Sequence, residues 1–200
     1  MEKKFKETPR ASNLSPRERL LLAADELFYA EGIYSVGIDR ILAYAGVAKS
    51  SLYSAFGSKE ELIKAYLTRR HEARRQRLEK HLAQIDTPRE RILAVFDVLG
   101  RVFAEPGFRG CAFLNASAES VPGTGVAQLC DTSRAWVRNL FEELGREAGV
   151  QDPAVLSRRM VMLYDGSSVA AQLDRDLDAA AEAREIAVSV LDAALAQASK

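Results

Sequence analysis

The chain has 200 residues, 48% of them hydrophobic, and its 28 basic side chains equal its 28 acidic ones in number. This composition suits an ordinary soluble core of one or two domains, and the zero net charge excludes a uniformly basic nucleic-acid binder. No apolar run approaches the ~20 residues that span a membrane, and the N-terminus lacks the apolar stretch of a secretory signal, so we expect a cytoplasmic protein.

Charge is distributed unevenly along the chain. Residues 1–80 hold 16 lysines and arginines against 11 aspartates and glutamates, whereas residues 81–200 hold 12 against 17. A basic N-terminal part joined to an acidic remainder suits a DNA-facing end followed by a part with another task. Chance variation among solvated charges is the alternative explanation.

The first predicted elements are an arm and a capped helix. Residues 1–14 are polar and mildly basic, and we expect a disordered arm that is either a floppy terminus or a contact to DNA. Ser15-Pro16-Arg17-Glu18 has the pattern of a capping box with proline at the first helical position. The helix that follows places five apolar residues on one face before Gly32 ends it: Leu20, Ala23, Ala24, Leu27 and Phe28.

Residues 38–56 have the spacing of a helix-turn-helix. A short helix carrying Ile41 and Leu42 is followed by Gly46, which adopts a left-handed turn without steric cost. The next helix, at about 48–55, has only Leu52 and Phe56 as clear inward anchors. Its remaining side chains are therefore left outward or at the edge: Lys49, Ser50, Ser51, Tyr53 and Ser54. Lysine, serine and tyrosine are side chains that reach phosphates and base edges.

The rest of the chain is predicted to be helical. Ser58-Lys59-Glu60-Glu61 is a second capping box, and its helix runs to about His81. Further helices start at Thr87-Pro88, within 109–119, at about 124 and at Asp152-Pro153, and a last one ends near 197. No stretch shows strand alternation. We therefore expect an all-α fold of about nine helices, with a DNA-binding domain over 15–60 and a ligand-binding and dimerisation domain over 61–200.

Lys59 stands out because a cation in the first turn of a helix opposes the helix dipole. The placement makes sense if an anion such as a DNA phosphate sits at that helix terminus, where backbone N–H groups also point. An ordinary surface lysine is the alternative.

Residues from about Arg17 to Leu67 resemble the N-terminal domain of the TetR family of transcriptional repressors. The matching residues are Ala23-Ala-Asp-Glu-Leu-Phe-Tyr-Ala-Glu-Gly32, Ile41, Ala45-Gly46-Val47, Leu52-Tyr53, Phe56 and Ser58-Lys59-Glu60-Glu61-Leu62. The resemblance implies that Lys49, Ser50, Ser51, Tyr53 and Ser54 face DNA and that Lys59 contacts a phosphate. Gly37 and Ala48 stand where the family often has a capping Thr or Ser, so two helix caps that the family usually has are missing here.

A repressor of this kind reads a palindromic operator as a homodimer. The last two helices carry apolar and small-residue stripes that suit a four-helix dimer interface: Leu156, Met160, Leu163, Ser167, Ala171, Ala183, Ile186, Ala187, Val190, Leu191 and Ala194. The alternative is that these stripes only bury the monomer's own core.

A pocket for a small-molecule inducer is expected among helices spanning about 88–172. The candidate lining residues are Phe96, Leu99, Phe103, Phe113, Asn115, Trp136, Met160, Tyr164 and Asp165, although each is also a reasonable core or structural residue. Cys111 and Cys130 lack CxxC spacing and are expected to be buried thiols, with a redox-sensing pair as the alternative.

The sequence predicts no cofactor, no metal site and no enzyme activity, because it has no nucleophile elbow, phosphate loop or metal-ligand cluster. We therefore expect a sequence-specific transcriptional repressor that is released from DNA by a small molecule. The alternative is a helix-turn-helix regulator that acts as an activator or without a ligand.

Overall fold

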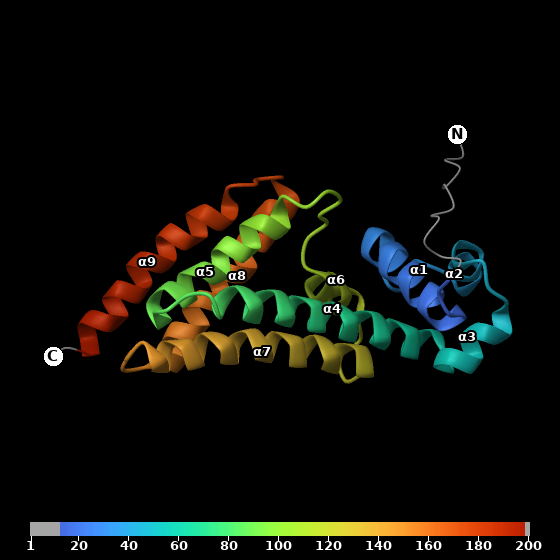
Figure 1. Ribbon diagram of the computed structural model, residues 1–200, viewed down its shortest axis with the longest axis horizontal. Coiled ribbons are helices and arrows are strands. Elements are labelled where there is room, and N and C mark those ends of the chain that lie inside the picture. Colours follow the sequence, from blue (N-terminus) through green and yellow to red (C-terminus); the bar gives the residue numbers. More distant parts are fainter. Residues whose placement is uncertain (1–12, 199–200) are drawn as a thin grey trace. The chain divides into compact units, whose positions relative to one another are not determined.

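The computed structural model describes residues 13–198, and it contains nine α-helices and no strand within that range (Figure 1). The chain divides into two compact units, with the boundary between Tyr66 and Leu67. The helices are α1 (Pro16–Glu31), α2 (Ile38–Ala45), α3 (Lys49–Phe56), α4 (Lys59–Leu82), α5 (Pro88–Phe103), α6 (Ala112–Glu119), α7 (Gly125–Glu147), α8 (Pro153–Leu173) and α9 (Ala179–Ala198). The expectation of an all-α fold is confirmed, and most of the predicted arm, residues 1–12, lies outside the described residues.

The first unit consists of α1 to α3 and the first two turns of α4. The predicted capping box is present at α1, where Ser15 accepts from the Glu18 N–H and Glu18 accepts from the Ser15 N–H. At α4 only half of the second predicted box forms. Ser58 accepts from the Glu61 N–H, but the Glu61 carboxylate pairs with Lys64 instead. The core of this unit is formed by fully buried apolar side chains: Leu20, Ala24, Ile41, Leu52, Leu62, Ile63 and Tyr66.

The turn between α2 and α3 depends on Gly46. Its φ of 60° is left-handed, and its carbonyl accepts a 2.7 Å hydrogen bond from the Arg19 guanidinium on α1. A Cβ at this position would lie 2.6 Å from that same Arg19 nitrogen. Both the backbone conformation and the close approach of α1 therefore favour glycine here.

The second unit contains most of α4 and helices α5 to α9. Helix α5 packs against α7, α8 and α9, while α8 packs against α7 and α9, and α6 covers α7. Its core is built from large side chains of several helices, including Phe96, Phe141, Met160 and Leu191. Ion pairs from Arg89 to Asp192 and from Arg184 to Asp97 tie the surfaces of α5 and α9 together.

None of the helices in the described part of the chain is long and apolar enough to cross a membrane.

Replacing Gly46 with alanine is expected to lower the free energy of unfolding by about 1–2 kcal/mol, since a left-handed residue with a Cβ is strained by roughly that amount. The added collision with Arg19 acts in the same direction. Chemical denaturation with urea measures the change. Gly37→Ser is the control, because Gly37 has an ordinary φ of −75° and open space around its Cβ position. Equal stabilities of Gly46→Ala and the native protein would contradict the assigned role.

Candidate nucleic-acid interface and pocket

Helix α3 presents a small polar face. Leu52 is fully buried and Phe56 is half-buried beneath the Arg17 guanidinium, whose carbon lies 4.9 Å from the ring centroid. The four outward residues, which are Lys49, Ser50, Tyr53 and Ser54, are exposed, and Ser51 is half-buried. Tyr53 is 46% exposed although it is a large aromatic residue. The structure thus gathers the predicted side chains on one accessible helix face whose groups suit DNA.

The N-termini of both helices of the motif lack side-chain caps. Gly37 is the N-cap of α2 and Ala48 is the N-cap of α3, and neither provides a side-chain hydrogen bond. The first N–H groups of α3 are therefore available to an external acceptor such as a phosphate. Gly37 itself is exposed.

Lys59 is half-buried at the N-terminus of α4. Its ammonium nitrogen lies 3.4 Å from the Tyr34 carbonyl oxygen and 5.9 Å from the ring centroids of Phe28 and Tyr34. The positive charge is thus held in place by the unit's own residues. Tyr34 and Tyr44 are further exposed aromatic residues of this unit that the sequence had not singled out. The Tyr44 hydroxyl donates to the Glu26 carboxylate, which raises its pKa to about 12.

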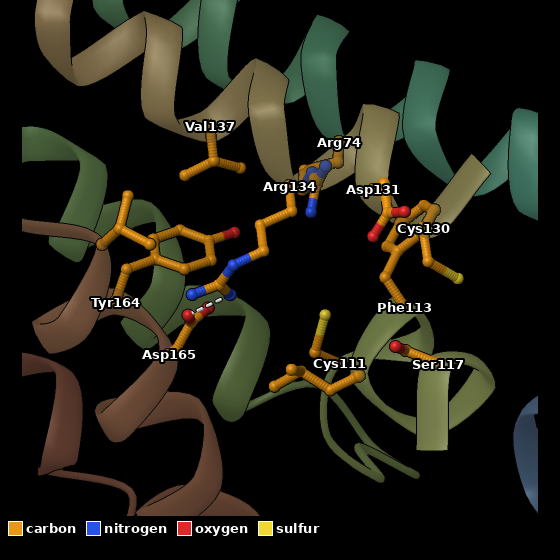
Figure 2. A pocket seen from close by; sticks show the side chains of 12 residues that line it. Arg74, Cys111, Phe113, Ser117, Cys130, Asp131, Arg134, Val137, Tyr164 and Asp165 are labelled. Carbon is orange, nitrogen blue, oxygen red and sulfur yellow. Dashed lines mark hydrogen bonds and ion pairs between the residues drawn. The ribbon is translucent and has the colours of Figure 1, made fainter. Parts of the chain in front are cut away.

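A pocket of about 60 Å³ lies in the second unit between α4, α6, α7 and α8 (Figure 2). The Tyr164 hydroxyl and the Cys111 Sγ both point into the space that the labelled side chains surround. The lining residues are Arg74, Cys111, Phe113, Leu114, Ser117, Cys130, Asp131, Arg134, Val137, Val161, Tyr164 and Asp165.

Three of the nine residues expected at a ligand pocket, namely Phe113, Tyr164 and Asp165, line this cavity. Another four, Phe96, Leu99, Phe103 and Met160, are buried in the hydrophobic core instead. Asn115 donates to the Arg109 carbonyl at 3.0 Å, and Trp136 is partly buried against the core. The sequence left open whether each of these residues lines a pocket or has a core or structural role, because helical spacing does not show whether an inward side chain meets a cavity or another side chain.

Arg74 lines the pocket although the sequence analysis did not single it out as a site residue. Its guanidinium donates to the Ser133 carbonyl at 3.0 Å and lies 4.8 Å from the Phe113 ring centroid and 5.7 Å from that of Trp136. The available signal was its spacing: Leu67, His71, Arg74 and Leu78 follow one another at helical intervals on one face of α4.

His71 shares this environment. Its Nδ1 lies 3.2 Å from the Ser133 Oγ, and its ring meets Phe113 and Trp136 edge to face, with centroids 6.3 and 5.7 Å apart. Burial, followed by the positive charge of Arg74, lowers the pKa of His71 below its ordinary 6.5. The neutral imidazole is therefore the favoured form at neutral pH.

The other titratable groups of the pocket are mostly compensated or neutral. Arg134 forms an ion pair with Asp165. Burial raises the pKa of the Cys130 thiol to about 11, with the nearby Cys111 as a further cause, so Cys130 stays protonated near neutral pH. Burial likewise raises the pKa of the Tyr164 hydroxyl, which therefore remains a hydrogen-bond donor. Both cysteines are free thiols in the structure.

The stripe expected at a dimer interface faces the unit's own core. Eight of its eleven residues are buried there: Leu156, Met160, Ser167, Ala171, Ala183, Ala187, Leu191 and Ala194. Leu163 and Val190 are partly buried, and Ile186 is 52% exposed. A different row on α8, formed by Met162, Gly166, Val169 and Leu173, is exposed to solvent.

Among residues 13–198 there is no group of three or more histidine, cysteine, aspartate or glutamate side chains that is arranged to hold a metal ion.

Comparison with known proteins agrees with this arrangement. Residues 20–66 match the family described as bacterial regulatory proteins, tetR family. A TetR-family transcriptional regulator from Streptomyces coelicolor, SCO4454, has the same fold with a TM-score of 0.85 and is 36% identical, over 90% of this chain and 95% of that one. The chain belongs to the TetR family. Its members are DNA-binding transcription regulators rather than enzymes, which agrees with the expectation from sequence.

Two curated TetR-family regulators resemble parts of the chain. The transcriptional repressor NemR of Escherichia coli is 35% identical over 105 residues, which are 52% of this chain and 53% of NemR. The transcriptional activator FasR of Mycolicibacterium smegmatis is 28% identical over 146 residues, which are 71% of this chain and 66% of FasR. The matched part of the chain thus spans about half the length of NemR.

The lowered pKa of His71 predicts a loss of stability in mild acid. Between its folded pKa and 6.5, the unfolded chain binds a proton that the folded chain does not, so the free energy of unfolding falls as the pH decreases through this window. Urea denaturation at pH 7.5, 6.5 and 5.5 measures the slope. His71→Gln is expected to flatten it, whereas the control His81→Gln should retain it because His71 remains. An unaltered slope in His71→Gln would contradict the assignment.

Proposed function

We propose that this TetR-family regulator is a homodimeric transcriptional repressor that binds a palindromic operator and is released by a small molecule bound in its second unit. The observation that carries the proposal is the exposed polar face of α3, which the buried Leu52 anchors in the core of the first unit. Lys49, Ser50, Tyr53 and Ser54 present an ammonium group and hydroxyl groups, while the buried Leu52 fixes the helix. These groups suit contacts with phosphates and with base edges in the major groove.

Lys59 and the uncapped N-terminus of α3 support the same proposal. A phosphate near either helix terminus would meet backbone N–H groups, and at α4 it would also meet a positive charge. Gly37 adds an exposed backbone position without a side chain at the start of α2. In this proposal these groups set the position of the protein on the DNA backbone, and the α3 side chains read the sequence.

The proposed dimer uses the solvent-facing sides of α8 and α9. On α8 an apolar row of Met162, Val169 and Leu173 is exposed, with Gly166 between them, and on α9 Ile186 is 52% exposed. A Cβ on Gly166 would meet no atom within 4 Å, so this glycine leaves room for a partner helix. To bind a palindrome, such a dimer needs its two reading heads, the α3 helices of the two first units, about one helical turn of DNA, roughly 34 Å, apart.

The proposed release works by a shift of population. Helix α4 is continuous from Lys59 to Leu82, so it contributes Tyr66 to the core of the first unit and Arg74 to the pocket of the second. A ligand that prefers the conformation in which the two reading heads are misaligned lowers DNA affinity by its differential affinity for that state.

Activation is the second candidate function, and the similarity to the activator FasR favours it. A reporter gene placed behind the selected operator separates the two. Lower expression with the protein than without it supports repression, and higher expression supports activation.

Selection from a randomised duplex library at ~150 mM salt, a concentration that suppresses purely electrostatic binding, is expected to enrich a palindrome. On that operator, Lys49→Ala and Tyr53→Ala should each weaken binding about 5- to 100-fold, because a specific base contact is worth roughly 1–3 kcal/mol. Fluorescence anisotropy of a labelled duplex measures the affinity.

Lys80→Ala is the matched control, since it removes the same charge from an exposed position of α4 outside the motif. It should change the affinity for the operator much less than Lys49→Ala. Failure to enrich any sequence with folded protein, or equal effects of the two lysine variants, would argue against specific reading by α3.

Introducing a charge on the proposed dimer face should separate the subunits. Val169→Glu and Ile186→Glu are each expected to weaken the dimer by at least about 100-fold, because an unpaired buried charge costs several kcal/mol. Both positions are exposed in the unit, so its fold should persist. Sedimentation velocity over a range of concentrations measures the change. Val121→Glu, an exposed apolar position outside α8 and α9, is the control, and a dimer that resists both variants would rule out this face.

A further inference from the structure

We propose that the pocket of the second unit is a site for a short-chain organic carboxylate, and that the Arg74 guanidinium on α4 binds the carboxylate group. This inference names the ligand class of the proposed regulator and so rests on the proposed function. Three observations support it: the unpaired charge of Arg74, the mostly apolar lining of the cavity and the small volume of the cavity.

The charge of Arg74 has no carboxylate partner among the described residues. Its hydrogen bonds go to uncharged groups, namely the carbonyl and hydroxyl of Ser133, the Nδ1 of His71 and the Tyr164 hydroxyl oxygen. Its Nε–H is buried without any partner. Arg19, Arg75 and Arg184 also have a buried Nε–H without a hydrogen-bond partner. Arg75 and Arg184 pair with acidic side chains, and Arg19 donates to the Gly46 carbonyl in the first unit, whereas Arg74 lines a cavity. A half-buried guanidinium left without an anion is costly, and a ligand carboxylate would relieve that cost.

Among the charged residues that line the pocket, Arg74 is the one suited to bind a ligand carboxylate. Arg134 is already neutralised by its ion pair with Asp165, and Asp131 is exposed to solvent. Guanidinium groups bind carboxylates through two parallel N–H···O bonds, which makes arginine the preferred residue for such ligands. A cationic ligand would instead be repelled by Arg74 and would find Asp165 already paired.

The remaining walls suit a short apolar body and a hydrogen-bond acceptor. Phe113, Leu114, Val137 and Val161 are apolar, and the Tyr164 hydroxyl, whose pKa burial raises, remains protonated and points into the cavity (Figure 2). The volume of about 60 Å³ is far below the ~300 Å³ of pockets that take drug-sized ligands. These features favour a ligand of few carbon atoms.

A carboxylate bound to Arg74 would change the contacts of α4, the helix that carries this residue. The guanidinium that would hold the carboxylate is the same group that joins α4 to Ser133 on α7. A ligand that competes for these N–H groups therefore changes how α4 is held in the second unit.

The chain's single tryptophan provides a local readout, because the Arg74 guanidinium lies over the Trp136 ring. Butyrate is the probe, with butyramide as the neutral analogue of the same shape and butylammonium as the cationic one, all at constant ionic strength. Acetate, hexanoate and their amides extend the series in both directions. Trp136 fluorescence of the full-length protein is followed without DNA, and calorimetry gives an affinity that does not depend on tryptophan.

We expect at least one carboxylate of the series to saturate the signal and to bind about 10- to 100-fold more tightly than its amide, since a charged hydrogen-bonded pair is worth roughly 1.5–3 kcal/mol. Arg74→Gln should abolish this preference. Arg74→Lys should retain part of it, because lysine keeps the positive charge but cannot form the two parallel hydrogen bonds of a guanidinium. Arg75→Gln, which removes the neighbouring charge outside the pocket, should leave it unchanged. Thermal denaturation confirms that each variant is folded.

Equal binding of carboxylates and amides by the native protein, or an undiminished preference in folded Arg74→Gln, would overturn the proposal. Because the native comparison needs no variant, the proposal remains testable if Arg74→Gln does not fold. The titration contains no DNA, so its failure is distinct from failure of operator binding. Adding the tight-binding carboxylate to the operator complex then shows whether it weakens DNA binding.

Discussion

Helix α4 bears the main structural constraint of the protein, because one continuous helix supplies buried residues to both units. Its first turns bury Leu62, Ile63 and Tyr66 in the first unit, and the following turns bury Leu67, Leu78 and Leu82. Between the latter residues, the same inward face carries His71 and Arg74. Two polar side chains on a buried face require partners, and the structure supplies Ser133 and the rings of Phe113 and Trp136. The pocket forms beside this polar contact.

In the first unit, few buried contacts hold α3, the helix proposed to read DNA. Helix α3 is anchored by a single fully buried leucine, by a half-buried phenylalanine under Arg17, and by the turn at Gly46 that Arg19 holds. This limited support leaves half of the eight-residue helix exposed. The missing side-chain caps at Gly37 and Ala48 weaken the isolated helices, since such a cap is typically worth about 1 kcal/mol. DNA phosphates that satisfy the same N–H groups would restore this stabilisation on binding.

The two last helices illustrate why an amphipathic stripe does not identify its partner. Ala187 and Leu191 lie on the apolar stripe of α9, but they pack within the unit's own core. Met162 and Val169 on α8, and Ile186 at the edge of the α9 stripe, stay exposed, and the proposed dimer uses them. Ser167 and Ser168 are buried in α8, and both hydroxyls donate to the Tyr164 carbonyl of the same helix. Neither serine therefore needs a hydrogen-bond acceptor from another helix or subunit.

The sequence by itself determined the features that depend on neighbouring residues. The caps at Ser15, Thr87 and Asp152, the left-handed turn at Gly46 and the outward residues of α3 follow from local hydrogen bonding and helical spacing. Tertiary structure alone decided what each buried face meets. It placed Arg74 at a pocket, put Phe96 and Met160 in the core instead of the expected pocket, and paired Glu61 with Lys64 instead of the N–H of Ser58. The physical reason is that periodicity defines which side of a helix is buried, whereas cavities and ion pairs depend on groups that are distant in the chain.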